Sequence, residues 1–353
     1  MNKGITYALL AAVLFGASTP FAKLLTGETP PVLLAGLLYA GSGLGLSAWL
    51  LLRRLARSTP SESGSITAGD LPWLAGAILS GGIIGPVLLM AGLSIVPASS
   101  ASLLLNMEGV LTALLAWFVF REQFDRRIFI GMLLIIAGGV LLSWDGGSPS
   151  PDSSLSWGAL GIVAACLCWA IDNNLTRKVS ASDAVQIAAL KGLVSGLVNL
   201  VFAFVWLELP LPDPLRIAAT GAVGFAGYGL SLVLFVLALR HLGTARTGAY
   251  FSAAPFVGAA ISLVMLGEQP DGVFWVAAAM MAVGIWLHLT ESHGHEHTHE
   301  HMFHAHPHFH DAHHQHAHDF PWDGKEPHTH PHEHAPLTHS HPHFPDIHHR
   351  HKH

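Results

Sequence analysis

The stretch Gly4–Lys23 reads GITYALLAAVLFGASTPFAK, and the stretch Gly158–Arg177 reads GALGIVAACLCWAIDNNLTR. The two stretches align along their whole length, so that Phe15 matches Trp169 and the terminal cations match each other. Each stretch supplies the roughly 20 apolar residues that a helix needs to cross the hydrocarbon core of a bilayer. The alignment therefore predicts two copies of one membrane-embedded unit, each beginning with a transmembrane helix.

Further segments of the chain are as long and as apolar, which predicts ten transmembrane helices in all. The segments span residues 5–25, 31–52, 72–93, 99–120, 127–143, 157–176, 184–206, 216–238, 244–266 and 271–290. Most connections between them are short and contain the usual breakers Gly, Pro, Ser and Asp. We expect an all-α integral membrane protein with one five-helix repeat at residues 1–145 and another at residues 146–291.

A second pair of stretches recurs later in the two copies. Residues 117–123 read WFVFREQ, and residues 263–269 read LVMLGEQ. Because each copy has an odd number of helices, the second copy must be inverted in the membrane, with Glu122 and Glu268 at opposite faces. Inverted repeats are typical of secondary transporters, whose sites lie near the bilayer midplane between the repeats. This pattern favours a transporter over an enzyme, and the sequence offers no nucleophile–base set or phosphate loop.

The composition supports a membrane protein and excludes several other classes. The chain is 51% hydrophobic and only 11% charged, whereas a soluble domain is about 25% charged. No basic patch suggests nucleic-acid binding. The two cysteines, Cys166 and Cys168, are too few for a disulfide framework and are expected to be small buried hydrophobic residues.

Lysine and arginine set the expected orientation, because cytoplasmic loops carry an excess of both. With the N-terminus in the cytoplasm, the inner ends hold Lys3, Arg53, Arg54, Arg57, Arg121, Arg126, Arg127, Arg177, Lys178, Arg240 and Arg246. The outer ends then hold only Lys23 and Arg216. We predict a multi-pass protein of the cell (inner) membrane, with both termini cytoplasmic, as a monomer or homodimer in the lipid bilayer.

The repeat pattern resembles the EamA type of the drug/metabolite transporter superfamily. The matching stretches are Ala98–Val140 and Thr244–Gly284, each combining a fourth helix that ends near a Glu with a Gly-rich fifth helix. The sequence departs from the commoner Gly-Glu pair at Arg121-Glu122. The resemblance implies alternating-access transport, usually outward, of small polar or amphipathic solutes such as amino acids, metabolites, nucleotide sugars or cationic drugs.

Three ionisable residues fall at membrane depth, where such groups are costly and often functional. Glu108 lies near the centre of the fourth helix and is a candidate ligand for a substrate cation or a proton. Lys191 in the seventh helix is a candidate counter-ion to Glu108 or ligand for a substrate carboxylate. Asp172 lies one turn from the inner end of the sixth helix and is a candidate for a gating or substrate contact. The alternatives are interhelical packing for Glu108, a snorkelling side chain for Lys191 and a helix-end role for Asp172.

Asn106, Trp169, Tyr228 and Tyr250 are further candidates to line a substrate cavity, because such cavities combine aromatic rings with a few polar groups. Packing or interfacial anchoring is the alternative for each of them. The third and eighth helices carry glycine runs at residues 81–86 and 221–227, which permit close helix contact and bending.

The tail, residues 292–353, differs in kind from the membrane body, because it holds 24 of the 26 histidines. Histidine alternates with other residues, and low hydrophobicity with many prolines predicts disorder. Imidazole suits Zn, Ni and Co ions. The candidate metal ligands are His293, His295, His297, His299, His301, His304, His306, His308, His310, His328, His330, His332 and His334. A solubilising, pH-buffering tail is the alternative.

These features support three functional hypotheses. The first is an exporter of a small organic metabolite that requires no cofactor and carries a cytoplasmic metal-binding tail. The second is a transition-metal (Zn, Ni or Co) exporter, which would need His, Cys, Asp or Glu clustered at membrane depth. The third is a membrane-anchored metal store. The first is preferred because His241 and His288 both fall at predicted helix ends.

Overall fold

The computed structural model describes residues 3–56, 67–120, 126–143, 154–176, 179, 183–290, 293–299, 302–308, 328–334 and 337–343. The chain divides into two compact units, Met1–Thr290 and Glu291–His353. The first unit is the membrane body, and the second is the tail.

The first repeat is built from helices in five successive spans. They are α1 (Lys3–Thr26); α2 (Pro31–Ala56); a third span made of η1 (Ala68–Asp70), α3 (Leu71–Ala77), η2 (Ile78–Ile84) and α4 (Gly85–Ile95); a fourth made of α5 (Ala98–Leu104) and α6 (Met107–Phe120); and α7 (Arg126–Ser143). Elements α5 and α6 meet at a break at Leu105 and Asn106, within the predicted fourth helix.

The second repeat follows the same plan. It contains α8 (Ser154–Thr176); α9 (Ala184–Val201) with η4 (Phe202–Trp206); α10 (Pro214–Gly224), η5 (Phe225–Leu230) and α11 (Ser231–Phe251); α12 (Ala254–Leu266); and α13 (Gly272–Leu289). Elements η2 and η5 are π-helical turns at the matching place in the two repeats. Such turns are rare and frequently mark functional sites.

Eight helices of the described chain are long and apolar enough to cross a membrane, and Ala254–Leu266 and Gly272–Leu287 are shorter apolar helices. Together they overlap all ten predicted segments. One boundary was wrong: we expected a break at residues 239–243, but α11 continues to Phe251. The chain breaks there because Pro255 has no N–H to donate to the Phe251 carbonyl four residues earlier.

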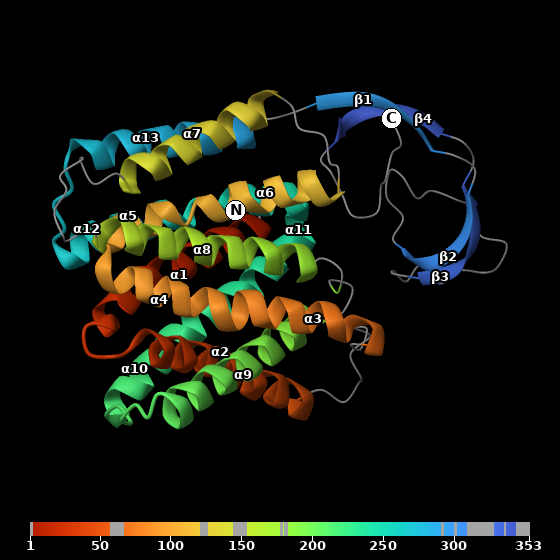
Figure 1. The fold of residues 1–353 in the computed structure, drawn as a ribbon. Coiled ribbons are helices and arrows are strands. Elements are labelled where there is room, and N and C mark those ends of the chain that lie inside the picture. Colours follow the sequence, from red (N-terminus) through yellow and green to blue (C-terminus); the bar gives the residue numbers. More distant parts are fainter. Residues whose placement is uncertain are drawn as a thin grey trace. The chain divides into compact units, whose positions relative to one another are not determined.

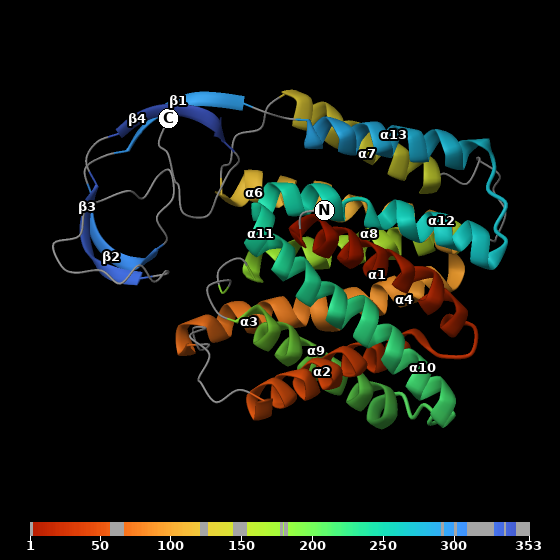
Figure 2. The same ribbon diagram turned by 180° about the vertical axis from the view of Figure 1, so that it is seen from behind.

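The two repeats pack with matched helix pairs. Helix α1 packs against α11 and α12 of the second repeat, and its counterpart α8 packs against α4 and α6 of the first. Helix α2 packs against α9, and α7 packs against α13. In Figures 1 and 2, α7 and α13 lie side by side at one edge of the bundle, and α2, α9 and α10 lie at the opposite edge. Five-helix units related in this way are two inverted repeats.

Small residues allow the α2–α9 pair to come close. A methyl group added at Gly192 would lie 2.6 Å from the Gly43 nitrogen, and one added at Gly196 would lie 2.5 Å from the Ala40 nitrogen. Small residues four apart permit this backbone contact in membranes, where dispersion contacts drive helix association. The α2–α9 contact therefore ties the two repeats together along one edge.

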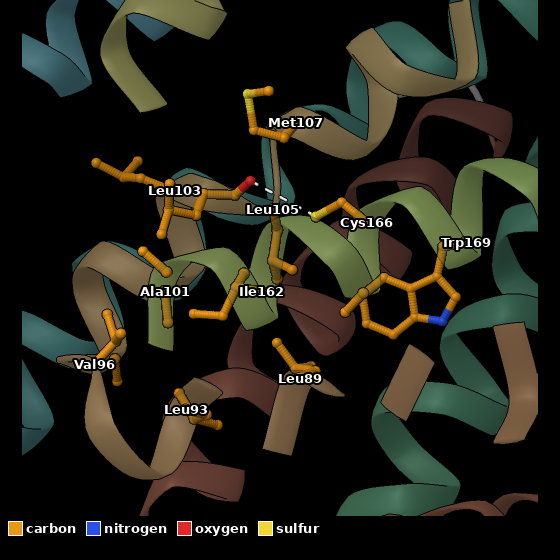
Figure 3. Close-up of a cluster of buried hydrophobic side chains, with 14 of the residues drawn as sticks. Leu89, Leu93, Val96, Ala101, Leu103, Leu105, Met107, Ile162, Cys166 and Trp169 are labelled. Carbon is orange, nitrogen blue, oxygen red and sulfur yellow. Dashed lines mark hydrogen bonds between the residues drawn. The ribbon is translucent and has the colours of Figure 1, made fainter. Parts of the chain in front are cut away.

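The largest apolar core lies around α4, α5 and α8. Leu89, Leu93, Leu103 and Ile162 are at most 1% exposed, and Figure 3 shows them together with the indole of Trp169 at the edge of the cluster. The Sγ of Cys166 lies 3.7 Å from the Leu104 carbonyl oxygen in the same core. The two cysteines are free, with Cys166 buried and Cys168 half-buried.

In the tail unit the structure describes four strands. Strand β1 (His293–His299) pairs antiparallel with β4 (Leu337–His343), and β2 (Met302–His308) pairs antiparallel with β3 (His328–His334). These segments differ from the disorder that we expected of the whole tail. Histidines that alternate with other residues match the two-residue period of a strand.

The strand register sets histidine opposite histidine. Examples are His295 opposite His341 in the first ladder and His306 opposite His330 in the second. The candidate ligands His301 and His310 lie outside the described residues.

Candidate functional site

The Asp172–Lys191 ion pair is the central feature of the candidate site. Nζ of Lys191 in α9 lies 2.6 Å and 2.7 Å from the two carboxylate oxygens of Asp172 in α8. The side chains are only 16% and 8% exposed, respectively. The hydroxyl of Thr176, one turn further along α8, donates to the same carboxylate over 2.8 Å. The hydrogen-bonded partner of Lys191 is therefore Asp172, whereas Glu108, the candidate counter-ion, interacts with Lys191 only electrostatically in the contacts described.

Glu108 is the second carboxylate of the site. It lies in the first turn of α6, where the helix dipole favours an anion. Its Oε1 accepts a hydrogen bond of 2.9 Å from Nδ2 of Asn173, the residue next to Asp172. Both Asp172 and Lys191 act electrostatically on Glu108, so the three charges form one cluster.

Open space lies beside Glu108. Glu108 is partly exposed, whereas Gly109 and Asn173 are exposed. A methyl group added at Gly109 would meet no atom within 4 Å. The Glu108 carboxylate is thus accessible from one side, although its helix packs against α8 on the other.

The π-helical turn η2 shapes the wall of the site opposite Asp172. The Gly81 carbonyl oxygen accepts hydrogen bonds from Trp169 Nε1 over 2.9 Å and from the Tyr39 hydroxyl over 3.1 Å. A side chain at position 81 would collide with the carboxyl group of Asp172. Glycine is therefore required here because two helices approach at a buried charge.

Aromatic rings extend the site toward the second repeat. Tyr39 and Tyr228 have ring centroids 5.5 Å apart, and Tyr228 meets Phe15 edge-on at 6.1 Å. Tyr228 lies in η5, the counterpart of η2. Trp169, aligned in sequence with Phe15, lies next to the Asp172 turn in α8. The predicted residues Glu108, Lys191, Asp172, Trp169 and Tyr228 thus gather around one region between the repeats.

Two predicted residues have other surroundings. Asn106 is buried in the α5–α6 break, where its Nδ2 donates to the Leu103 carbonyl over 2.9 Å and lies 3.8 Å from Met281 Sδ. Tyr250 is half-buried near the end of α11, and its carbonyl accepts a hydrogen bond from the Ala253 N–H. The Asn106 contacts fit a structural role for that side chain at the helix break.

Sequence reasoning missed Tyr39, Asn173 and Thr176 as members of the site. Tyr39 carries a usable signal, since it is a polar ring midway along an apolar helix. Asn173 carries no comparable signal, because its contact with Glu108 joins two different helices.

When both carboxylates are ionised, two carboxylates and one ammonium leave this cluster with one uncompensated negative charge. In a region of low dielectric constant such a charge attracts a cation strongly. Among the described residues, no group of three or more His, Cys, Asp or Glu side chains could hold a metal ion. A carboxylate in this setting can bind an organic ammonium group or a proton.

Comparison with protein-family models identifies the family. The model of the EamA-like transporter family matches residues 2–144 and again residues 156–290. The two matches coincide with the two five-helix repeats of the structure.

Individual relatives agree with this match. An uncharacterized transporter of Methanothermobacter thermautotrophicus is 27% identical over 294 residues, covering 80% of this chain and 85% of that protein. The inner membrane transporter YedA of Escherichia coli is 23% identical, covering 79% and 88%. A probable amino-acid metabolite efflux pump of Salmonella typhimurium is 25% identical, covering 80% and 93%.

The fold also matches a solved structure. One crystal structure aligns with a TM-score of 0.60 at 19% identity and covers 82% of this chain and 99% of the other. At this level of identity the likeness concerns the fold.

Proposed function

Because this chain belongs to the EamA-like transporter family, a group of the drug/metabolite transporter superfamily, we propose that it exports a small organic metabolite by alternating access. The observation that carries the proposal is the Asp172–Lys191–Glu108 cluster between the two repeats. It combines a neutralised ion pair with a carboxylate that is partly exposed. A relative described as a probable amino-acid metabolite efflux pump supports this class of substrate.

Each charged residue has a distinct role in this proposal. Glu108 binds the ammonium group of the substrate, or a proton when the substrate has left. Lys191 and Asp172 form an ion pair. The contact of Asp172 with Gly81 keeps the π-helical turn η2 in position. Tyr39, Trp169 and Tyr228 cover the apolar part of the substrate, and cation–π attraction adds to binding of an ammonium group. The chain carries out no covalent step and requires no cofactor.

Export needs a defined orientation and compartment. We place the chain in the inner membrane with both termini in the cytoplasm. The support is the bias of lysine and arginine toward one side and the description of the Escherichia coli relative as an inner membrane transporter. The cytoplasmic tail binds Zn, Ni or Co ions through its histidines and buffers or senses them beside the transporter.

The proposal is tested by comparing cells that express the full chain with cells that express Glu108→Gln. We expect the full chain to raise at least one metabolite in the medium, measured by mass spectrometry, and Glu108→Gln to abolish the rise because a neutral amide lacks the negative charge that attracts a cation and does not titrate. Glu28→Gln, at an exposed carboxylate that pairs with Arg216, is the matched control and should export normally.

Intracellular Zn, Ni and Co are measured in the same cells. A fall in one of these metals that depends on Glu108 would contradict the organic substrate and establish the metal-exporter alternative. Metal content that follows the tail alone and ignores Glu108 agrees with our proposal.

A further inference from the structure

Lys23 forms hydrogen bonds with the end of the third span. Its Nζ donates to the carbonyl oxygens of Leu93, Ser94 and Val96 over 2.5, 3.3 and 2.9 Å. These carbonyls lie at the C-terminal end of α4, where the helix leaves its last carbonyls unpaired and its dipole favours a cation. Lys23 is the last basic residue of α1, so this contact joins α1 to α4.

Glu268 belongs to the second repeat and binds the start of the fourth span of the first repeat. Its two carboxylate oxygens accept hydrogen bonds from the Ala98 and Ser99 N–H groups over 2.7 and 2.9 Å. These N–H groups begin α5, and Glu268 lies two residues beyond the end of α12. Gly267 makes this contact possible, because it ends α12 with a left-handed backbone at φ +64° that a side chain would strain.

The two contacts together form a clamp on the turn between α4 and α5. We use the name corner clamp for Lys23, Glu268 and the main-chain groups of residues 93–99 that they bind. Lys23 and Glu268 also attract each other electrostatically. The corner clamp therefore joins α1, α4 and α5 of the first repeat to α12 of the second.

The opposite end of the bundle differs at the matching place. Under the repeat symmetry the α4–α5 turn corresponds to residues near 240–245, where α11 runs without a break. A continuous helix uses its N–H and carbonyl groups internally, so it offers none to a clamp. The symmetry-related charges, Arg177 and Glu122, lie outside the described residues.

Packing shows the same asymmetry. Helix α5 packs against α12 beside the corner clamp. Between α6 and α11, the elements in the mirrored positions, the described part of the chain has no comparable contact. Among the described residues, the α5–α12 contact beside the corner clamp is therefore the stronger of the two mirrored contacts.

We propose that the corner clamp is the latch of the outer gate, which closes the route from the substrate site to the outside while the site is open to the cytoplasm. The assignment of the clamp to the outer face rests on the orientation given under the proposed function. Releasing the clamp shifts the protein toward its outward-open state. Lys23 and Glu268 are thus positioning residues that set the balance of the two states without touching the substrate.

Thiol accessibility tests the latch without a substrate. Ser102 in α5 is fully buried beneath the clamp, beside Gly258 of α12, so Ser102→Cys reports opening at this end. Gly109→Cys, at an exposed position of α6 next to Glu108, reports access to the substrate site. Each reporter is placed in full-length protein that carries Cys166→Ala and Cys168→Ser. The labelling rate with a membrane-impermeant maleimide is measured in right-side-out and inside-out vesicles.

We expect Glu268→Gln to raise labelling of Ser102→Cys from outside about tenfold, because charge-assisted hydrogen bonds are lost. Labelling of Gly109→Cys from the cytoplasmic side should fall in the same variant. Lys23→Met should act in the same direction, and Glu28→Gln should change neither rate.

Unchanged labelling of Ser102→Cys in the Glu268→Gln variant would contradict the proposed latch. A rise at both reporters would also overturn it, since that pattern means local unfolding rather than a change of state. A rise seen only from the cytoplasmic side would overturn the assignment to the outer gate. These outcomes are independent of whether the substrate is an organic metabolite or a metal ion.

Discussion

At the scale of single residues, the Asp172–Lys191 pair decides how charge is tolerated inside the bundle. Two opposite charges at hydrogen-bond distance offset much of the cost of removing each from water. Glu108 has only the Asn173 amide as a hydrogen-bond donor in the contacts described above, so its charge is the one available to a ligand. This division between an ion-paired carboxylate and a carboxylate bonded to a neutral amide follows from which helix faces meet.

The pair predicts a non-additive effect on stability. Asp172→Asn leaves the Lys191 ammonium unpaired and should destabilise the protein by about 3–5 kcal/mol. The double variant Asp172→Asn with Lys191→Met removes both charges and should recover most of that loss. Unfolding of the purified protein in detergent measures both values. Equal losses in the single and double variants would mean that the two charges do not depend on each other.

At the scale of elements, the π-helical turns distinguish this bundle from ten straight spans. Turn η2 presents the Gly81 carbonyl to Tyr39 and Trp169, and η5 carries Tyr228 toward the same region. The glycine runs at residues 81–86 and 221–227 overlap these turns in part. Their equivalent places in the two repeats give the candidate site an approximate twofold arrangement.

Gly81→Ala tests this packing. The added methyl would collide with the Asp172 carboxyl, and overpacking of this kind should cost about 1–3 kcal/mol of unfolding free energy. Gly248→Ala is the matched control, because its methyl would enter open space on α11. The control should be neutral or stabilising by up to about 1 kcal/mol from helix propensity. Thermal unfolding compares the two, and a neutral Gly81→Ala would contradict the close contact.

At the scale of the whole molecule, the chain joins an apolar transporter body to a histidine-rich tail. The body carries its functional candidates between the repeats, whereas the tail carries them along two strand ladders. Either part can be altered without removing the other, so their roles are separable by experiment.

Deleting residues 292–353 should abolish Zn binding by the purified protein, measured by titration calorimetry. Binding by the full chain should fall between pH 7.5 and pH 5.5, because histidine accepts a proton below about pH 6 and a protonated imidazole cannot bind a metal. Retention of binding by the truncated protein would place the metal site in the body instead.

The strand register allows a second test of metal binding by the tail. Replacing His295 and His341, which are opposite each other, should remove fewer bound ions than replacing His295 and His330, which belong to different ladders. Equal losses would indicate that only the number of histidines matters, as in a disordered tail.

The sequence by itself determined the membrane location, the ten apolar segments, the two repeats and the family resemblance. These features depend on length, hydropathy and local periodicity, which a single chain displays directly. Its intramembrane charges also identified Glu108, Asp172 and Lys191, because few such residues are tolerated there.

Only the tertiary structure decided which of these groups meet. The partner of Lys191, the inclusion of Tyr39, the contact of Glu268 with α5 and the unbroken course of α11 all depend on helix faces far apart in sequence. A helix displays its charges on all sides, and the packing of neighbouring helices selects which side becomes the interior. Local pattern cannot give that selection, because it is set by contacts between the two repeats.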